Sequence, residues 1–207
     1  GESEPFLGRA LKKYPRNSFY LATKLPVWLV NSVEDAERLF KEQLSRLQTK
    51  YIDYYLLHAL DAGRWEKLVK EGIIEWAEAK KASGKIRHLG FSFHDTYPVF
   101  REILTYRQWD FCQIQYNYID TQVQAGDKGY ELAAKMGVPM VIMEPVKGGR
   151  LANLPEEAKE ALNEADPDRS AASWALRWVG SHENVKVILS GMSSMEQLED
   201  NLETFGK

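Results

Sequence analysis

The sequence predicts an α/β fold built on a parallel sheet, and three features of the chain support this prediction. Short apolar segments alternate with amphipathic helical patterns along the 207 residues. Most of the apolar segments are continuous, which is typical of strands that are covered on both faces. No linker rich in proline, glycine or serine divides the chain. We therefore expect one domain over residues 1–207, with right-handed crossovers between parallel strands.

Six apolar segments rich in β-branched and aromatic residues are predicted to form the strands. They cover residues 19–24, 52–58, 88–94, 111–117, 139–145 and 185–192. The second of them reads IDYYLLH and ends on His58. Because histidine titrates near neutral pH, a histidine at the end of a buried strand is a candidate for chemistry.

Helical patterns lie before the first strand, between the strands and after the last. They cover residues 3–14, 32–48, 65–84, 98–106, 128–136, 169–179 and 194–205. In the helix over 32–48, Ser32 is a suitable N-cap, and Glu34 and Asp35 suit the positive end of the helix dipole. Its expected apolar face consists of Ala36, Leu39, Phe40, Leu44 and Leu47. The helix over 65–84 ends in a lysine-rich turn followed by Gly84.

Composition and charge favour a small-molecule partner. The formal net charge is -3 and the pI is about 5.9, so no attraction to nucleic acid or to anionic lipid is expected. No apolar run reaches the roughly 20 residues that span a bilayer, and the first residues lack the pattern of a signal peptide. The single cysteine, Cys112, lies in an apolar run, and the sequence has no metal-ligand motif. These features predict a cytoplasmic protein and indicate no particular oligomeric state.

Two parallel α/β architectures compete, a (β/α)8 barrel and a doubly wound open sheet. The open sheet favours a G-x-G-x-x-G motif after an early strand, and the sequence has none. A (β/α)8 TIM barrel is therefore preferred. Only six of its eight strands are counted, and the first is preceded by one helix with no strand before it.

Motifs at the strand ends resemble those of a known family. In chain order they read ESEPFLGRAL, LATK, IDYYLLH, GKIRHLGFSFH, QIQYN, MEPVKGGRL and ILSGMSSMEQLEDNL. In this order and spacing, from end to end, they resemble the aldo-keto reductase family. The forms MEPVKGGRLA and SGMSSMEQ are most similar to a branch whose members often carry a ferredoxin-like segment after the barrel. Because the sequence has no C-x-x-C run, an iron-sulfur cluster is expected only in a C-terminal segment beyond these residues.

The resemblance implies a barrel that is incomplete in this sequence. It places the start of the chain after the second strand of the family barrel, and it places the catalytic tyrosine and aspartate of the family before Gly1. We therefore expect the chain to be part of a longer protein, truncated at the N-terminus and possibly at the C-terminus. A six-stranded remnant would leave two strand edges unpaired.

Lys24 and His58 match two positions of the family's catalytic tetrad. Both stand at predicted strand ends, where barrel enzymes build their active sites. Reduction of a carbonyl needs a hydride on carbon and a proton on oxygen. The resemblance implies that Lys24 lowers the pKa of a proton-donating tyrosine and that His58 orients the carbonyl oxygen.

The resemblance also implies an NADP(H) site. It assigns Ser92 and Gln113 to the nicotinamide carboxamide, although Phe93 replaces a family asparagine, and it places Met143 where many relatives stack an aromatic ring. Glu144 replaces a small polar residue there. The phosphate contacts are expected from Lys147, Gly148, Gly149, Arg150, Ser190, Gly191, Met192 and Ser194, and the adenine contacts from Gln197 and Asn201. The loop at 190–194 has no lysine or arginine, so NADP rather than NAD follows only from the family.

Three further residues are candidates for the substrate pocket. Trp28 and Trp65 follow strands at the expected active-site end, and His94 ends another strand.

The leading function is an oxidoreductase that interconverts a carbonyl substrate and an alcohol with NADP(H). A nucleotide-binding regulatory or redox-sensing subunit with little turnover is the alternative, and a barrel isomerase or lyase without nucleotide is a third possibility.

Overall fold

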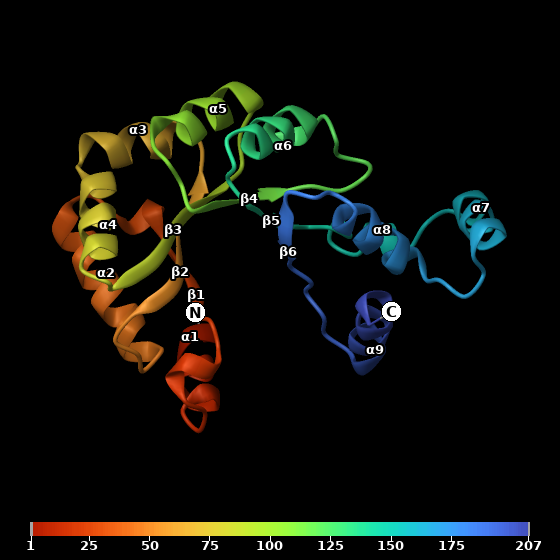
Figure 1. Cartoon of the computed structure of the whole chain (residues 1–207), viewed down its shortest axis with the longest axis horizontal. Coiled ribbons are helices and arrows are strands. Elements are labelled where there is room, and N and C mark those ends of the chain that lie inside the picture. Colours follow the sequence, from red (N-terminus) through yellow and green to blue (C-terminus); the bar gives the residue numbers. More distant parts are fainter. Residues whose placement is uncertain (1, 207) are drawn as a thin grey trace. The chain divides into compact units, whose positions relative to one another are not determined.

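The structure is a computed structural model that describes residues 2–206, so the terminal residues of the expected 1–207 domain lie outside the described part. Within that part, six strands alternate with helices in the predicted order (Figure 1). The strands are Ala22–Leu25 (β1), Ile52–Leu60 (β2), Ile86–Phe93 (β3), Phe111–Gln115 (β4), Met140–Met143 (β5) and Val185–Ile188 (β6). The α-helices are Ser3–Leu11 (α1), Val33–Arg46 (α2), Ala62–Lys70 (α3), Ile73–Ala82 (α4), Tyr97–Tyr106 (α5), Gly126–Lys135 (α6), Glu156–Ala165 (α7), Ala171–Gly180 (α8) and Met195–Phe205 (α9). Short 3-10 helices cover Arg16–Ser18 (η1), Val27–Leu29 (η2) and Arg150–Ala152 (η3).

The residues group into two compact units. The first contains the chain up to Asp95 together with Glu102–Cys112, and the second contains Thr96–Arg101 together with the chain from Gln113 onward. Strand β4 and helix α5 each contribute residues to both units. The expectation of a single domain remains a prediction.

The first unit is built on three parallel strands. β1 pairs with β2 in a register that sets Lys24 opposite Leu56, and β2 pairs with β3 with Leu57 opposite Phe91. Helices α2 and α4 pack on these strands and on each other. The rings of Phe40, Tyr55 and Trp76 meet edge to face with centroids 5.2 and 5.8 Å apart, and all three are buried. This aromatic cluster fastens α2 and α4 to β2.

Strand β2 is longer than the sequence predicts. It continues two residues past His58 to Leu60, and its register with β3 shifts between Leu57 and Leu60. His58 therefore lies within an irregular stretch of the strand and does not end it. A bulge of this kind changes the direction in which side chains point.

One predicted helix is two helices in the structure. The helix expected over 65–84 breaks between α3 and α4 at Gly72, where φ is +70°. Glycine adopts this left-handed conformation without strain, and it commonly ends a helix for that reason. Helix α1 is also shorter than expected, because it ends at Leu11.

The second unit contains the parallel pair β5 and β6 and the helices α6 to α9. Met140 pairs with Val185, and Ile142 pairs with Ile188. Helix α7 has no buried residue and was not predicted. Its polar character explains the omission, because sequence reasoning finds helices by their apolar faces. Between residues 2 and 206, no helix is both long and apolar enough to span a membrane.

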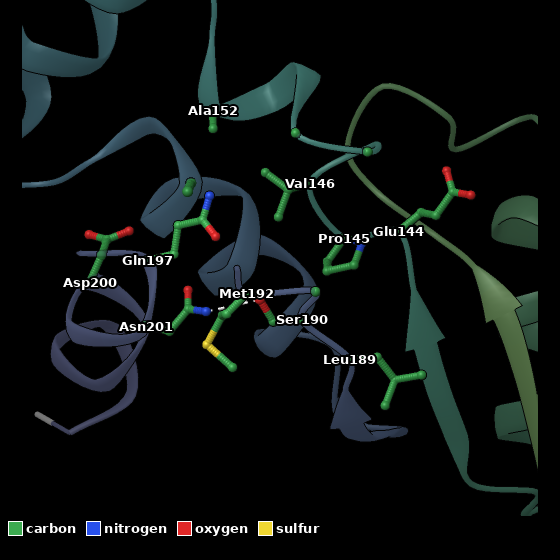
Figure 2. Close-up of a pocket in the computed structure, with 14 residues that line it drawn as sticks. Glu144, Pro145, Val146, Ala152, Leu189, Ser190, Met192, Gln197, Asp200 and Asn201 are labelled. Atoms are coloured by element: carbon green, nitrogen blue, oxygen red, sulfur yellow. Dashed lines mark hydrogen bonds between the residues drawn. The ribbon is translucent and has the colours of Figure 1, made fainter. Parts of the chain in front are cut away.

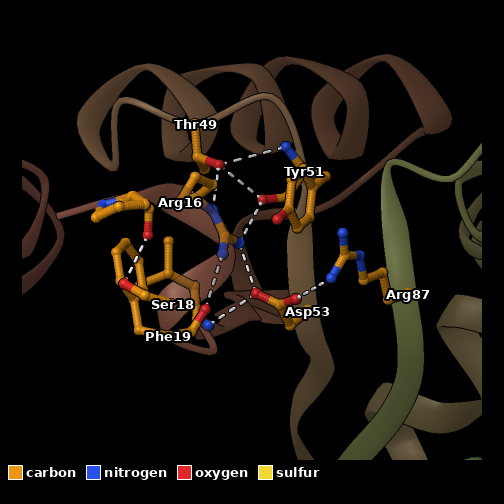
Figure 3. A network of polar contacts seen from close by, with 9 residues as sticks. Arg16, Ser18, Phe19, Thr49, Tyr51, Asp53 and Arg87 are labelled. Atoms are coloured by element: carbon orange, nitrogen blue, oxygen red, sulfur yellow. Dashed lines mark hydrogen bonds and ion pairs between the residues drawn. The ribbon is translucent and has the colours of Figure 1, made fainter. Parts of the chain in front are cut away.

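A buried carboxylate joins β2 and β3 to the chain before β1 (Figure 3). Asp53 is 1% exposed and accepts hydrogen bonds from Arg16 at 2.5 Å, Arg87 at 2.9 Å and the backbone N–H of Leu21 at 2.9 Å. The guanidinium groups of Arg16 and Arg87 also lie 4.0 and 3.9 Å from the ring centroid of Tyr51. Two cations and a backbone N–H therefore satisfy one buried charge.

We predict that Asp53→Asn destabilises the protein by about 3–5 kcal/mol, because the substitution leaves Arg16 in a partly buried position without its counter-charge. Urea denaturation followed by tryptophan fluorescence measures this change. Glu156→Gln is the matched control, since Glu156 forms an exposed pair with Lys159, and should leave the midpoint unchanged. Equal midpoints for the two variants would contradict the role given to Asp53.

Candidate functional site

Lys24 lies on β1 with its side chain partly buried in the first unit. Burial lowers the pKa of its ammonium group. Its backbone carbonyl accepts a hydrogen bond of 2.8 Å from Nε2 of Gln43 on α2. Helix α2, which the sequence predicts only by its apolar packing face, therefore fixes the backbone of β1 at Lys24.

Gln43 is the centre of a polar network that includes the backbone carbonyl of Lys24. It is 3% exposed, and its Nε2 also donates to Glu4 Oε1 at 2.9 Å, while the Tyr55 hydroxyl donates to its Oε1 at 2.7 Å. Glu4 in turn accepts from Thr23 at 2.6 Å and pairs with Arg46 at 2.7 Å. Helices α1 and α2 are thus tied to β1 and β2 by hydrogen bonds that satisfy every polar group of the Gln43 side chain.

His58 lies on β2, half-buried beside Trp28. The two ring centroids are 5.1 Å apart. Burial, followed by the positive charges of Lys24, His94 and Arg64, lowers the pKa of His58 to about 4. The imidazole is therefore neutral at pH 7, and one of its nitrogens carries a hydrogen that it can donate to an oxygen.

Lys24, His58 and Trp28 share one pocket of about 370 Å³ in the first unit. Glu4, Thr23, Gln43 and Arg46 complete the part of its wall that belongs to the polar network. The structure thus brings together the two predicted catalytic residues and one predicted substrate contact. Trp28 is 50% exposed, so its ring offers apolar surface at the mouth of this pocket.

The structure places the other candidates of the first unit differently. Trp65 is 3% exposed, packs edge to face on Tyr106 and donates from Nε1 to Glu102 at 3.1 Å. Trp65 is therefore an interior packing residue in this structure and is not among the residues that line the pocket of Lys24 and His58. His94 is exposed at the end of β3, where its backbone N–H donates to Leu60. Ser92 is buried, and its Oγ accepts a hydrogen bond from the backbone N–H of Ala59 at 2.7 Å.

In the second unit, two of the three expected nicotinamide contacts meet. Gln113 on β4 is 5% exposed, and its Nε2 lies 3.2 Å from Sδ of Met143 on β5. Met143 is the last residue of β5, and Gln113 is the middle residue of β4. An amide and a polarizable thioether in contact are compatible with a bound heteroaromatic ring.

A second pocket, of about 310 Å³, lies in the second unit (Figure 2). Seven of the predicted cofactor residues line it, namely Gly148, Gly149, Ser190, Gly191, Met192, Gln197 and Asn201. Asn201 Nδ2 donates to Ser190 Oγ at 2.9 Å, which joins α9 to the segment after β6. The glycines leave their part of the wall open, since a Cβ added at any of them would meet no atom within 4 Å.

The expected pair of phosphate-binding cations is not found in this pocket. Lys147 forms an ion pair with the buried carboxylate of Asp120, which also accepts from Gln115 and Asn117. Its charge is therefore paired within the protein, and a contact between Lys147 and phosphate stays a prediction. Arg150 is exposed at the start of η3, and Ser194 caps α9 by accepting from the N–H of Gln197 at 3.3 Å. Among the described wall residues, the charged ones are Glu144 and Asp200.

Two residues of these sites were missed in the sequence. Gln43 stands three residues after Phe40 on the apolar face of its helix, where a polar residue in a core position could have been noticed. Leu44, which was expected on that face, is only half-buried. Asp120 follows β4 in a loop, and no sequence signal distinguishes it from a solvated aspartate.

Comparison with known proteins gives a consistent result. A sequence model described as "Aldo/keto reductase family" matches residues 1–207. The NADH-specific methylglyoxal reductase of Escherichia coli is 26% identical over 246 residues, which cover 98% of this chain and 74% of that protein. The L-galactose dehydrogenase of Arabidopsis thaliana is 26% identical over 224 residues, which cover 97% and 68%.

Solved structures agree with the sequence matches. The holo form of an aldo-keto reductase from Bacillus halodurans is 30% identical and superposes with a TM-score of 0.80, covering 97% of this chain and 70% of that one. This similarity supports the expected α/β barrel class, of which the described residues contain six strands.

We predict that the imidazole of His58 titrates near pH 4 and that Lys24→Met raises its pKa, because one of the cations that disfavour imidazolium is removed. The pKa should stay below the ordinary value of 6.5, since burial is the larger cause. Nitrogen-15 NMR of labelled histidine gives the titration. Because the pKa is lower in the folded state, the contribution of His58 to stability should be complete above pH 6.5 and decline towards pH 4.

Lys67→Met removes a positive charge from α3 without touching His58 and is the control, because Lys67 donates to Asn31. An identical His58 titration in wild type and Lys24→Met would show that the two groups do not interact.

Proposed function

This chain belongs to the aldo/keto reductase family. We propose that it contains the active site of an oxidoreductase that reduces an aldehyde or a ketone to an alcohol. The observation that supports this proposal is the single pocket shared by Lys24, His58 and Trp28. β1 and β2 run parallel, and both catalytic candidates lie near the carboxyl ends of their strands. Barrel enzymes build their active sites at that edge.

His58 is suited to bind the carbonyl oxygen of the substrate. Its depressed pKa keeps the imidazole neutral at physiological pH, so a ring N–H donates a hydrogen bond without carrying a charge of its own. Such a donor stabilises negative charge as it develops on the oxygen. Trp28 beside it offers an apolar surface for the remainder of the substrate.

Lys24 is suited to act on the proton donor. A partly buried ammonium favours the ionised form of a neighbouring phenol and so lowers its pKa. The family resemblance implies that this phenol is a catalytic tyrosine. The role proposed for Lys24 is therefore electrostatic, and its own proton is not transferred.

The pocket of the second unit supports a dinucleotide cofactor. When bound, a reduced nicotinamide supplies the hydride. Open glycine backbone at 148, 149 and 191 permits close approach of phosphate groups, and the amides of Gln197 and Asn201 offer donors and acceptors to a base.

NADP(H) is the proposed cofactor on the basis of the family resemblance, and NADH is the second one to test. The matched reductase of Escherichia coli is named as NADH-specific. The carboxylates of Glu144 and Asp200 in the pocket wall would also repel a 2′-phosphate that came close to them. The alternative of a regulatory subunit with little turnover is not favoured, because the relatives with stated activities are a reductase and a dehydrogenase.

We predict that Lys24→Met in the full-length protein lowers kcat for aldehyde and ketone reduction by on the order of 10²–10⁴-fold, because the proton donor loses its electrostatic partner. The Kd for NADPH and for NADH, measured by fluorescence titration, should stay within about twofold, a change worth less than 0.5 kcal/mol. A panel of aldehydes, ketones and dicarbonyls provides the substrates.

Lys67→Met is again the control and should retain wild-type turnover. Full activity in Lys24→Met would remove Lys24 from the mechanism. A protein that binds either nucleotide tightly and reduces no substrate of the panel would contradict the proposed function.

A further inference from the structure

The backbone directly after His58 has an unusual conformation. Ala59 has a φ of +55°, in the left-handed region that residues with a Cβ rarely adopt. It lies in the stretch where the register of β2 against β3 shifts. A strained residue next to a catalytic candidate persists only if the surrounding structure holds it.

Two side chains hold this residue from opposite ends. The N–H of Ala59 donates to Ser92 Oγ on β3 at 2.7 Å, and the C=O of Ala59 accepts from the Arg64 guanidinium on α3 at 2.6 Å. Ser92 is 1% exposed, and the side chains before and after it, Phe91 and Phe93, are fully buried. The hydroxyl therefore has a fixed position from which to accept.

Arg64 is also fixed at its base. The backbone N–H of Arg64 donates to the carboxylate of Asp61, the N-cap of α3, at 2.8 Å. The guanidinium of Arg64 lies 3.2 Å from the other carboxylate oxygen of Asp61. One residue further along β2, Leu60 accepts from the N–H of His94 at 3.0 Å. The strand segment after His58 is thus anchored to both β3 and α3.

The geometry has a direct consequence for His58. The N–H that Ser92 accepts belongs to the peptide group joining His58 to Ala59, so the hydrogen bond sets the orientation of that peptide plane. Side chains of a regular strand point alternately to opposite faces, and a bulge changes this direction. The direction of the imidazole therefore depends on the bulge.

We propose that Ser92 and Arg64 are positioning residues for His58, which hold the Ala59 bulge so that the imidazole faces the pocket shared with Lys24 and Trp28. This inference rests on the proposed function of that pocket. It differs from the role that the family resemblance assigns to Ser92, a contact with the nicotinamide carboxamide. A serine hydroxyl can accept one hydrogen bond and donate another, so the two roles are separable by experiment.

Ser92→Ala tests the proposal, with Ser92→Thr as the variant that retains the hydroxyl. We expect Ser92→Ala to lower kcat on the order of 10–100-fold through misplacement of His58, with an unchanged Kd for NADPH and NADH. Ser92→Thr should recover most of the lost turnover. Gln113→Met is the comparison for a lost carboxamide contact and should raise the Kd for the nucleotide.

The titration of His58 is a second readout that needs no turnover. Lys24, His94 and Arg64 are the charged groups that act on His58, and all three remain in Ser92→Ala. A relaxed bulge should expose the ring, so the pKa of His58 should rise from about 4 towards 6.5 in Ser92→Ala and remain near 4 in Ser92→Thr. Wild-type protein that reduces no carbonyl would overturn the proposed function, while this shift would still support the positioning role.

Arg64→Met provides an independent arm, because Arg64 is partly exposed and its loss should not prevent folding. It should lower kcat with an unchanged nucleotide Kd, whereas Lys67→Met on the same helix should not. The proposal is overturned if Ser92→Ala behaves like Gln113→Met, with a raised Kd, an unchanged kcat at saturation and an unmoved His58 titration. Wild-type turnover in Arg64→Met would overturn the positioning role proposed for Arg64.

Discussion

The parallel register of β1 against β2 is the constraint on which the catalytic pocket depends. Lys24 stands opposite Leu56, two residues before His58 on the same strand. Since parallel strands end at one edge of a sheet, this register brings an ammonium and an imidazole into one pocket without any contribution from a loop. The bulge after His58 then adjusts the direction of the ring.

Buried hydrogen bonds hold the backbone at Lys24 and at His58 in place. Gln43 donates to the Lys24 carbonyl and accepts from Tyr55, while Ser92 accepts from the peptide group after His58. Buried donors and acceptors are costly when unpaired, so each of these contacts favours one arrangement of the backbone. The same burial that makes these contacts effective lowers the pKa of Lys24 and of His58. Rigidity and altered ionisation therefore have a common physical origin.

The agreement between sequence and structure varies with how local the signal is. All six strands occur where continuous apolar segments predict them, because such segments have few alternatives to a covered sheet. The helix expected over 65–84 is divided at Gly72, whose left-handed backbone outweighs the helical pattern on either side. Trp65 was expected at a pocket and is interior, and Lys147 was expected on a phosphate and pairs with Asp120. A lysine near a glycine-rich turn has the same local sequence whether it binds a phosphate or pairs with a carboxylate of the protein.

By itself, the sequence determined the family, the order of strands and helices, and the residue types that stand at the strand ends. These depend on periodicity and on short motifs, which can be recognised without knowledge of distant residues. Only the tertiary structure decided which polar groups face one another: Gln43 with Lys24, Ser92 with Ala59, and Asp120 with Lys147. Each of these pairs joins residues that lie 19 to 33 positions apart. Burial and backbone direction select these pairs, and the local sequence pattern predicts neither of them.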